Sequence, residues 1–227
     1  GLIGEQRFHN AMHKFNDIPS TADPNEVIRG FQSLLNFTQS ASFLPAQGRR
    51  FYNNVIMRFA DYLLFTGQDD ELAQKIYLKA FLLQPKGSPY RTPLLSILER
   101  GLYLKDQEID LLLVILQTEG FRDSKVVDQL ALLFLRKCSL TRKTEPVFLS
   151  AIESKSDNTN KIVGFIIPRL LEKKRSDFFA MSFYVASLHW EFPEVLQVRE
   201  IVARAYCQGF WEGSNTSLHQ KCGEVFQ

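Results

Sequence analysis

The stretch Phe59-Ala60-Asp61-Tyr62-Leu63-Leu64-Phe65-Thr66-Gly67, followed by Gln68-Asp69-Asp70, decides the fold of this chain. Its apolar residues recur at helical spacing, and the Gly-Gln-Asp-Asp sequence predicts a turn after them. A second helix is predicted from about Asp70 to Leu83, and Pro85 ends it because proline is not tolerated in a helix interior. Together the two segments predict an antiparallel helical hairpin.

The same pattern returns along the chain with a period of about 36 residues. Large and small apolar residues recur in one register, as closely packed helices require. In the first helices, Phe59 corresponds to Leu95, Leu130, Ile166 and Val202, and Ala60 to Ser96, Ala131, Ile167 and Ala203. In the second helices, Ala73 corresponds to Ile109, Thr144 and Ala180; Tyr77 to Leu113, Phe148 and Tyr184; and Ala80 to Leu116, Ala151 and Ser187. This repetition predicts an all-α solenoid of stacked hairpins.

Residues 53–85 resemble one tetratricopeptide repeat. The residues that carry the resemblance are Ala60, Gly67, Ala73, Tyr77, Ala80 and Pro85, with one extra residue in the turn. The resemblance implies a right-handed α-solenoid whose first helices line a groove. The later units have Tyr103, Cys138 and Lys174 in place of the turn glycine, and their period is closer to that of pentatricopeptide or irregular helical repeats.

Three segments are expected along the chain: an N-terminal helical hairpin in residues 1–45, the helical repeats in 46–212 and a polar tail in 213–227. In the first segment, Asp23 is the predicted N-cap of a helix, with Pro24 in the first turn and Glu26 as the capping glutamate. Pro45 and Gly48 suggest that residues 40–50 form a linker. The tail is expected to be loosely ordered or to belong to a truncated next element.

Composition places the chain among ordinary helical domains. Its 227 residues are 45% hydrophobic, which supplies an ample core, and the formal net charge is only +2. The three cysteines show no metal-binding spacing and no disulfide framework, so a reducing, cytoplasmic location is expected, either as such or as the cytoplasmic domain of a larger protein. No transmembrane segment is predicted.

Catalysis is not indicated. The sequence has no phosphate-binding glycine loop, no dinucleotide fingerprint and no nucleophile elbow, so the chain is predicted not to be an enzyme and to need no cofactor. His9 and His13 share a helix face, but without the glutamate of a zinc protease they are interpreted as solvated side chains and not as metal ligands. Cys138 has cationic neighbours, yet no histidine lies near it in sequence, which favours a structural cysteine at a turn.

Two surfaces are candidates for binding a partner. The first is the groove that the resemblance implies. Tetratricopeptide domains that clamp a carboxylate use lysine and asparagine on the first helix, but Met57 and Asp61 stand at those positions here, which counts against capture of an acidic chaperone tail. The predicted groove residues are Asn54, Met57, Arg58, Asp61, Phe65, Lys125 and Lys161.

The second surface is a basic rim at the inter-helix turns, where cations recur with the repeat. We define the basic rim as Arg136, Lys137, Arg142, Lys143, Lys173, Lys174 and Arg175; Arg100 and Lys105 flank the preceding turn. Such a rim suits an acidic protein, a phosphate backbone or anionic lipid. The other interpretation is that these are solvated turn residues, since cations are favoured at helix C-termini.

The leading functional hypothesis is a non-catalytic scaffold that binds a protein or peptide, an acidic one if the rim is used. The alternative is a nucleic-acid binder of pentatricopeptide type, which reads bases with polar side chains of its first helices. The equivalent positions here are Asp61, Ile97, Leu132 and Pro168, a mostly apolar set that disfavours base reading. An enzyme with a helical fold is a third class.

Overall fold

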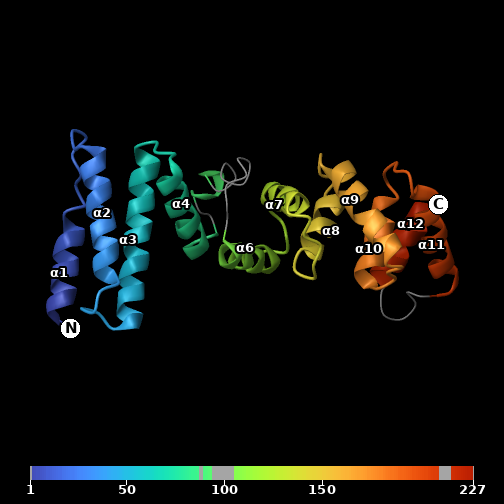
Figure 1. Ribbon diagram of the computed structural model, residues 1–227, viewed down its shortest axis with the longest axis horizontal. Coiled ribbons are helices and arrows are strands. Elements are labelled where there is room, and N and C mark those ends of the chain that lie inside the picture. Colours follow the sequence, from blue (N-terminus) through green and yellow to red (C-terminus); the bar gives the residue numbers. More distant parts are fainter. Residues whose placement is uncertain (1, 87–88, 94–104, 210–215, 227) are drawn as a thin grey trace. The chain divides into compact units, whose positions relative to one another are not determined.

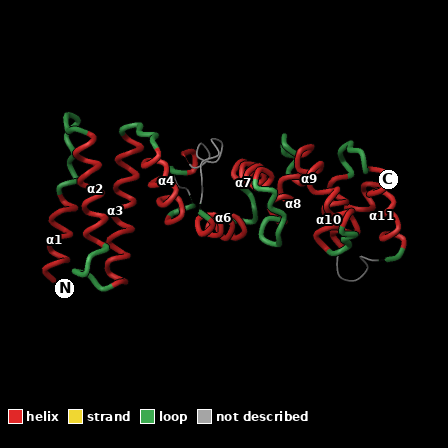
Figure 2. Tube along the Cα trace, in the orientation of Figure 1, coloured by secondary structure: helices red, strands yellow, loops and turns green. Residues whose placement is uncertain are grey.

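A computed structural model describes residues 2–86, 89–93, 105–209 and 216–226 of the chain. This described part consists of helices and turns and contains no strand (Figure 1, Figure 2), which confirms the all-α class. The chain divides into two compact units, residues 1–97 and 98–227. The predicted positions Leu95, Ser96, Ile97, Arg100 and Tyr103 lie outside the described residues.

The first unit contains the helices α1 (Leu2–His13), α2 (Pro24–Thr38), α3 (Pro45–Phe65) and α4 (Glu71–Leu83), each packed against the next along the chain (Figure 1). The predicted N-cap and first-turn proline of α2 are confirmed: the Asp23 side chain accepts a hydrogen bond from the backbone N–H of Asn25, and Pro24 opens the helix. The expected capping role of Glu26 is wrong, because its carboxylate makes no hydrogen bond to the described residues. Asp70 caps α4 in the same way, through the N–H of Ala73.

The predicted linker at residues 40–50 is wrong, because α3 begins at Pro45 and runs for 21 residues. Proline suits the first position of a helix, where no N–H partner is needed. Gly48 is buried, and a Cβ atom there would lie 2.5 Å from the carbonyl oxygen of Thr38. The two residues that indicated a linker therefore start a helix and let α2 approach it closely.

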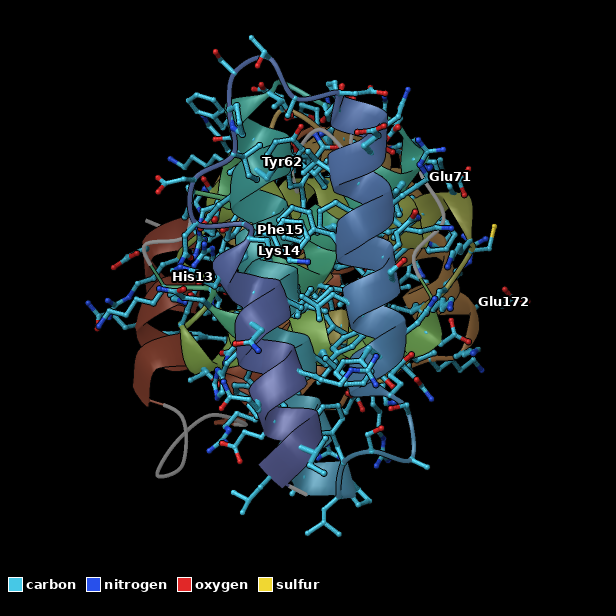
Figure 3. The ribbon with its side chains drawn as sticks, turned by 90° about the vertical axis from the view of Figure 1, so that its left-hand side faces the viewer. His13, Lys14, Phe15, Tyr62, Glu71 and Glu172 are labelled. Carbon is cyan, nitrogen blue, oxygen red and sulfur yellow. The ribbon has the colours of Figure 1, made fainter. Side chains whose placement is uncertain are left out.

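Stacked phenylalanine rings form the core of the first unit. Phe8 lies on Phe51 with ring centroids 4.1 Å apart, and Phe31 lies between Phe15 at 4.0 Å and Phe59 at 4.8 Å. Figure 3 shows Phe15 in the space between α1 and α2. Aromatic pairs add about 0.5–1.5 kcal/mol beyond the area that they bury. This cluster ties the N-terminal helices to α3 and explains part of the high phenylalanine content.

The second unit contains α6 (Asp106–Thr118), α7 (Ser124–Arg136), α8 (Glu145–Glu153), α9 (Thr159–Glu172), α10 (Phe178–Ser187), α11 (Val195–Cys207) and α12 (Thr216–Phe226). Consecutive helices pack together from α7 onward, and three contacts skip a helix: α7 packs on α9, α8 packs on α10, and α10 packs on α12. Residues 213–227, expected as a polar tail, thus include a helix that packs on α10 and α11 and whose Cys222 is fully buried.

Burial agrees with the register found in the sequence. Ala60, Tyr77 and Ala80 are buried, as predicted, at 0%, 3% and 0% exposure. Among the described equivalents, only Leu113 and Ala203 are half-buried, and the others are buried: Leu130, Ile166, Val202, Ala131, Ile167, Ile109, Thr144, Ala180, Phe148, Tyr184, Leu116, Ala151 and Ser187. The apolar pattern therefore identifies the faces that make up the two cores.

Five inter-helix turns of the described residues share one backbone conformation, at Gly67, Gly120, Cys138, Lys155 and Lys174. Gly67, Cys138 and Lys174 follow the ends of α3, α7 and α9 with φ of 68°, 49° and 50°. At each turn this residue donates to the carbonyl three positions back, and the next residue donates to the carbonyl five positions back, which is the Schellman pattern. The turns that lack glycine therefore keep the glycine conformation.

Candidate functional site

The predicted groove residues of the first unit lie along α3 but do not form a free binding surface. Arg58 donates a hydrogen bond to Asn16 in the loop after α1. Asp61 accepts one from Tyr90, whose ring is buried, and burial together with this bond raises the pKa of Tyr90 well above its ordinary value. Met57 is half-buried, whereas Phe65 is 89% exposed and Asn54 is exposed. Two of the five side chains thus hold neighbouring segments in place.

The other predicted groove residues, Lys125 and Lys161, belong to the second unit. Lys125 is exposed near the start of α7, and Lys161 is exposed near the start of α9, two helices that pack against each other. Neither ammonium group makes an ion pair with a described residue. Both therefore remain available to a partner.

The turns of the predicted basic rim are tied together within the second unit. Arg175, in the turn after α9, donates to the carboxylate of Glu145 at the start of α8 at 2.7 Å. The turn between α7 and α8 is held by the Thr144 hydroxyl, which donates to the carbonyl of Ser139 and accepts from the N–H of Thr141. Arg136, Arg142, Lys173 and Lys174 are exposed in these turns, as is Lys137.

Arg175 and Lys143 of the basic rim form ion pairs within the second unit. Besides Glu145, Arg175 binds Asp177 at 2.7 Å, and its side chain is only 25% exposed; hydrogen bonds from Arg175 lower the pKa of the Asp177 carboxyl. Lys143 lies 3.2 Å from Asp110 on α6. The expectation that Arg175 is a free, exposed cation is therefore wrong. Its guanidinium joins the turn after α9 to the start of α8 and does not face a partner.

A cleft that the sequence did not predict lies between α8, α10 and α12. Its volume is about 340 Å3. Among its lining residues, Ile152, Ser182 and Val185 are buried, and Leu149, Ala186 and Trp190 are half-buried. We call Ile152 and Val185 the floor of the cleft. The exposed lining residues are Glu153, Lys155, Phe178, His189, Lys221 and Glu224.

The chemistry of the cleft combines an apolar interior with polar groups that have no partner. Phe178, the first residue of α10, is 56% exposed. The Ser182 hydroxyl makes no hydrogen bond to the described residues, although the residue is only 7% exposed. At the edge, Lys221 of α12 lies 3.5 Å from Glu153 of α8, so an ion pair joins two walls. An apolar pocket with a few convergent polar groups is the usual form of a binding site.

The sequence contained little signal for this cleft. Its walls come from α8, α10 and α12, whereas the resemblance directed attention to the first helices of the predicted hairpins. One wall is α12, which polar composition assigned to a tail. The exposed aromatic Phe178, next to a run of apolar residues, was the only visible sign.

Metal-ligating side chains do not gather in the described part of the chain. No group of three His, Cys, Asp or Glu side chains there could hold a metal ion. His9 lies 3.7 Å from Glu5, and His13 is hydrogen-bonded to Asn16, so each of the two histidines has its own neighbour. The described helices include none that is long and apolar enough to cross a membrane.

Comparisons with models of protein families, with curated proteins and with solved structures found no match to this chain. The resemblance to tetratricopeptide repeats therefore stays a prediction.

Proposed function

We propose that the chain is a non-catalytic protein-interaction module that holds a segment of a partner protein in the cleft between α8, α10 and α12. The observation that carries this proposal is the combination of a buried apolar floor with an exposed aromatic side chain at its edge. An apolar side chain of the partner would fill the floor, where burial is worth about 1.5–3 kcal/mol. Clusters of this kind, with an aromatic anchor and a polar surround, dominate interface energies.

Polar groups of the cleft would set the orientation of the segment. The Ser182 hydroxyl is placed to bond a backbone group of the partner, which offsets the cost of burying that group. Lys155 and Glu224 are exposed and make no ion pair with described residues, so each can meet an opposite charge beside the apolar anchor. The occupant is thus a peptide segment with one large apolar residue between charged ones.

We also propose that both units are parts of a tetratricopeptide-like α-solenoid with a period of about 36. Two observations support it. The Schellman turns after Gly67, Cys138 and Lys174 recur at positions that the period relates. In addition, the Tyr77 hydroxyl donates to the carbonyl of Gln68, and the Tyr184 hydroxyl donates to the carbonyl of Arg175, nine residues back in both cases.

Selection of peptides from a random phage library tests the binding proposal. Peptides that bind the wild-type chain should lose affinity for Phe178→Ala, by about 30-fold if the ring is a hot spot of about 2 kcal/mol. The matched control is Leu196→Ala on α11, a 73% exposed side chain outside the cleft. Unchanged affinity in Phe178→Ala, with loss in the control, would place the peptide site elsewhere.

The alternative is nucleic-acid binding through the basic rim, since Arg136, Arg142, Lys173 and Lys174 are exposed in adjoining turns. Binding of single-stranded RNA at increasing salt concentration distinguishes it, because each phosphate contact adds to the slope of affinity against salt. A steep slope that Lys173→Gln with Lys174→Gln reduces would favour this alternative. Weak binding, unaffected by both substitutions, leaves the peptide cleft as the functional site.

A further inference from the structure

Besides Phe65 at the C-terminal end of α3, three of the most exposed apolar side chains of the described residues lie in the first unit. Leu2 and Ile3, in the first turn of α1, are 86% and 82% exposed, and Leu44, just before α3, is 74% exposed. Scattered single exposures are ordinary on protein surfaces. Several together, rimmed by polar groups, indicate an interaction site.

The packing of the first unit brings these side chains to one end. A Cβ atom on Gly4 would lie 3.0 Å from the carbonyl oxygen of Ser42 and 3.4 Å from the ring of Phe43. The first turn of α1 therefore rests on the segment that leads directly into Leu44. Figure 1 shows the start of α1 and the connection from α2 to α3 at the same end of the unit.

Cations surround the same end, and none of them is neutralised by a carboxylate. The Arg7 guanidinium lies over the ring of Phe37 at 4.9 Å, and that of Arg50 over the ring of Phe51 at 5.2 Å. Arg49 lines a surface hollow of about 640 Å3 together with Leu44 and Tyr52. The three arginines are exposed and form no ion pair with a described residue.

The tip carries little negative charge. In residues 2–10 and 37–52 the only acidic residue is Glu5. Its carboxylate is half-buried, accepts a hydrogen bond from Gln47 at 3.3 Å and lies 3.7 Å from the ring of His9. The arginines thus face solvent without a competing anion, and their field attracts an anionic partner.

We propose that this basic apolar tip, defined by Leu2, Ile3, Arg7, Leu44, Arg49 and Arg50, docks on an anionic lipid membrane. Apolar side chains that project together from one end suit the acyl boundary of a bilayer, while arginines stay at the level of the headgroups. Anionic headgroups supply the complementary charge, and each arginine near such a surface raises the binding constant about fivefold. Neither the cleft nor the basic rim of the second unit takes part.

Co-sedimentation with vesicles tests the proposal, using the full chain with any purification tag at its C-terminus. Vesicles of phosphatidylcholine with phosphatidylserine should bind the chain, and vesicles of phosphatidylcholine alone should bind it far less. Replacing Arg7, Arg49 and Arg50 together by glutamine should lower the binding constant about a hundredfold. Replacing Leu2, Ile3 and Leu44 by serine should lower it at least tenfold, also at low salt.

A matched triple variant of the second unit, Arg136→Gln with Arg142→Gln and Lys173→Gln, removes as much charge and should change the binding constant by less than threefold. Leu44→Trp gives a second readout once the emission of the two native tryptophans is subtracted with the wild-type spectrum. Insertion should shift the added fluorescence to shorter wavelength and allow brominated lipid to quench it. The proposal is overturned by absent binding, by equal binding to both vesicle types, or by an equal effect of the control triple. An unshifted Leu44→Trp spectrum on bound protein overturns it too.

Discussion

The hairpin α3–α4 of the first unit and the hairpin α9–α10 of the second close in the same way with different residues. Gly67 and Lys174 hold the same left-handed conformation, and a tyrosine hydroxyl bonds a turn carbonyl nine residues before it in both. The residue after Gly67 is the neutral Gln68, whereas the residue after Lys174 is Arg175, which binds Glu145 and Asp177.

This difference shows that glycine is not what fixes the turn. The Schellman hydrogen bonds and the tyrosine are common to both hairpins, so the backbone geometry is set by the helix end and by packing. A lysine in the left-handed region costs about 1 kcal/mol relative to glycine. In the second unit, the two ion pairs of Arg175 stabilise the turn in which Lys174 holds a strained backbone conformation.

The largest expected effect comes from the small buried residues that the predicted period relates. Ala80 and Ser187 occupy equivalent positions and are both 0% exposed. Ala80→Leu and Ser187→Leu should each lower the free energy of unfolding by about 1–3 kcal/mol through overpacking. Guanidinium denaturation measures the loss. The control is Lys75→Leu, an exposed site on α4, and a loss there as large as in Ala80→Leu would contradict the register.

Because Arg175 forms ion pairs and Gln68 does not, charge reversal at this turn position should destabilise the second hairpin more than the first. Arg175→Glu should destabilise by about 2 kcal/mol, because a carboxylate would face Glu145 and Asp177 in a half-buried site. Gln68→Glu and Lys174→Glu, both at turn positions, should change the free energy of unfolding by less than about 0.5 kcal/mol. Hydrogen exchange of α9 and α10 locates the effect. Equal exchange in Arg175→Glu and wild type would contradict a structural role for this arginine.

The sequence predicts the elements and the core more completely than the surfaces. Periodic burial at Ala60, Tyr77 and Phe148 could be read directly, because core packing imposes a helical period. Pro45 and Gly48 were misread because the same residues that break structure also start a helix or permit close contact. The pairing of Arg175 with Glu145 joins residues 30 apart across two helices, and sequence spacing alone cannot indicate it.

The candidate site lay mostly outside what a single sequence can indicate. The cleft depends on how α8, α10 and α12 pack together, and α12 contributes a wall despite its polar composition. The basic rim was easier to find, since cations at successive turns are visible as a pattern. Which of them are engaged, such as Lys143 with Asp110, depends on tertiary contacts.

Exchanging the turn residues tests whether the backbone conformation is what the hairpins share. Gly67→Ala should destabilise by about 1 kcal/mol from its φ of 68° alone, because no atom lies within 4 Å of the added Cβ. Lys174→Gly should stabilise by about 0.5 kcal/mol, since relief of the left-handed strain exceeds the entropy that glycine adds to the unfolded chain. Denaturation midpoints give both values. A loss of stability in Lys174→Gly would show that its side chain matters more than its φ.

Effects as small as those of the turn residues belong to the two tyrosine hydroxyls. Tyr77→Phe removes a hydrogen bond of 2.6 Å and should cost about 1 kcal/mol, whereas Tyr184→Phe removes one of 3.2 Å and should cost about 0.5 kcal/mol. Burial, with Asp69 and Asp70 nearby, raises the pKa of Tyr77 to about 12. The folded pKa of Tyr77 lies above the unfolded value of about 10. The stabilisation that the neutral hydroxyl gives the folded state is therefore fully present below pH 10 and is lost as the pH rises to 12. The denaturant concentration at the unfolding midpoint of the wild type should therefore decrease as the pH is raised from 10 to 12. It should decrease less in Tyr77→Phe. Identical pH profiles for the two proteins would show that Tyr77 does not titrate with unfolding, and the shared tyrosine bond would then be a weaker link between the hairpins than the turn conformation itself.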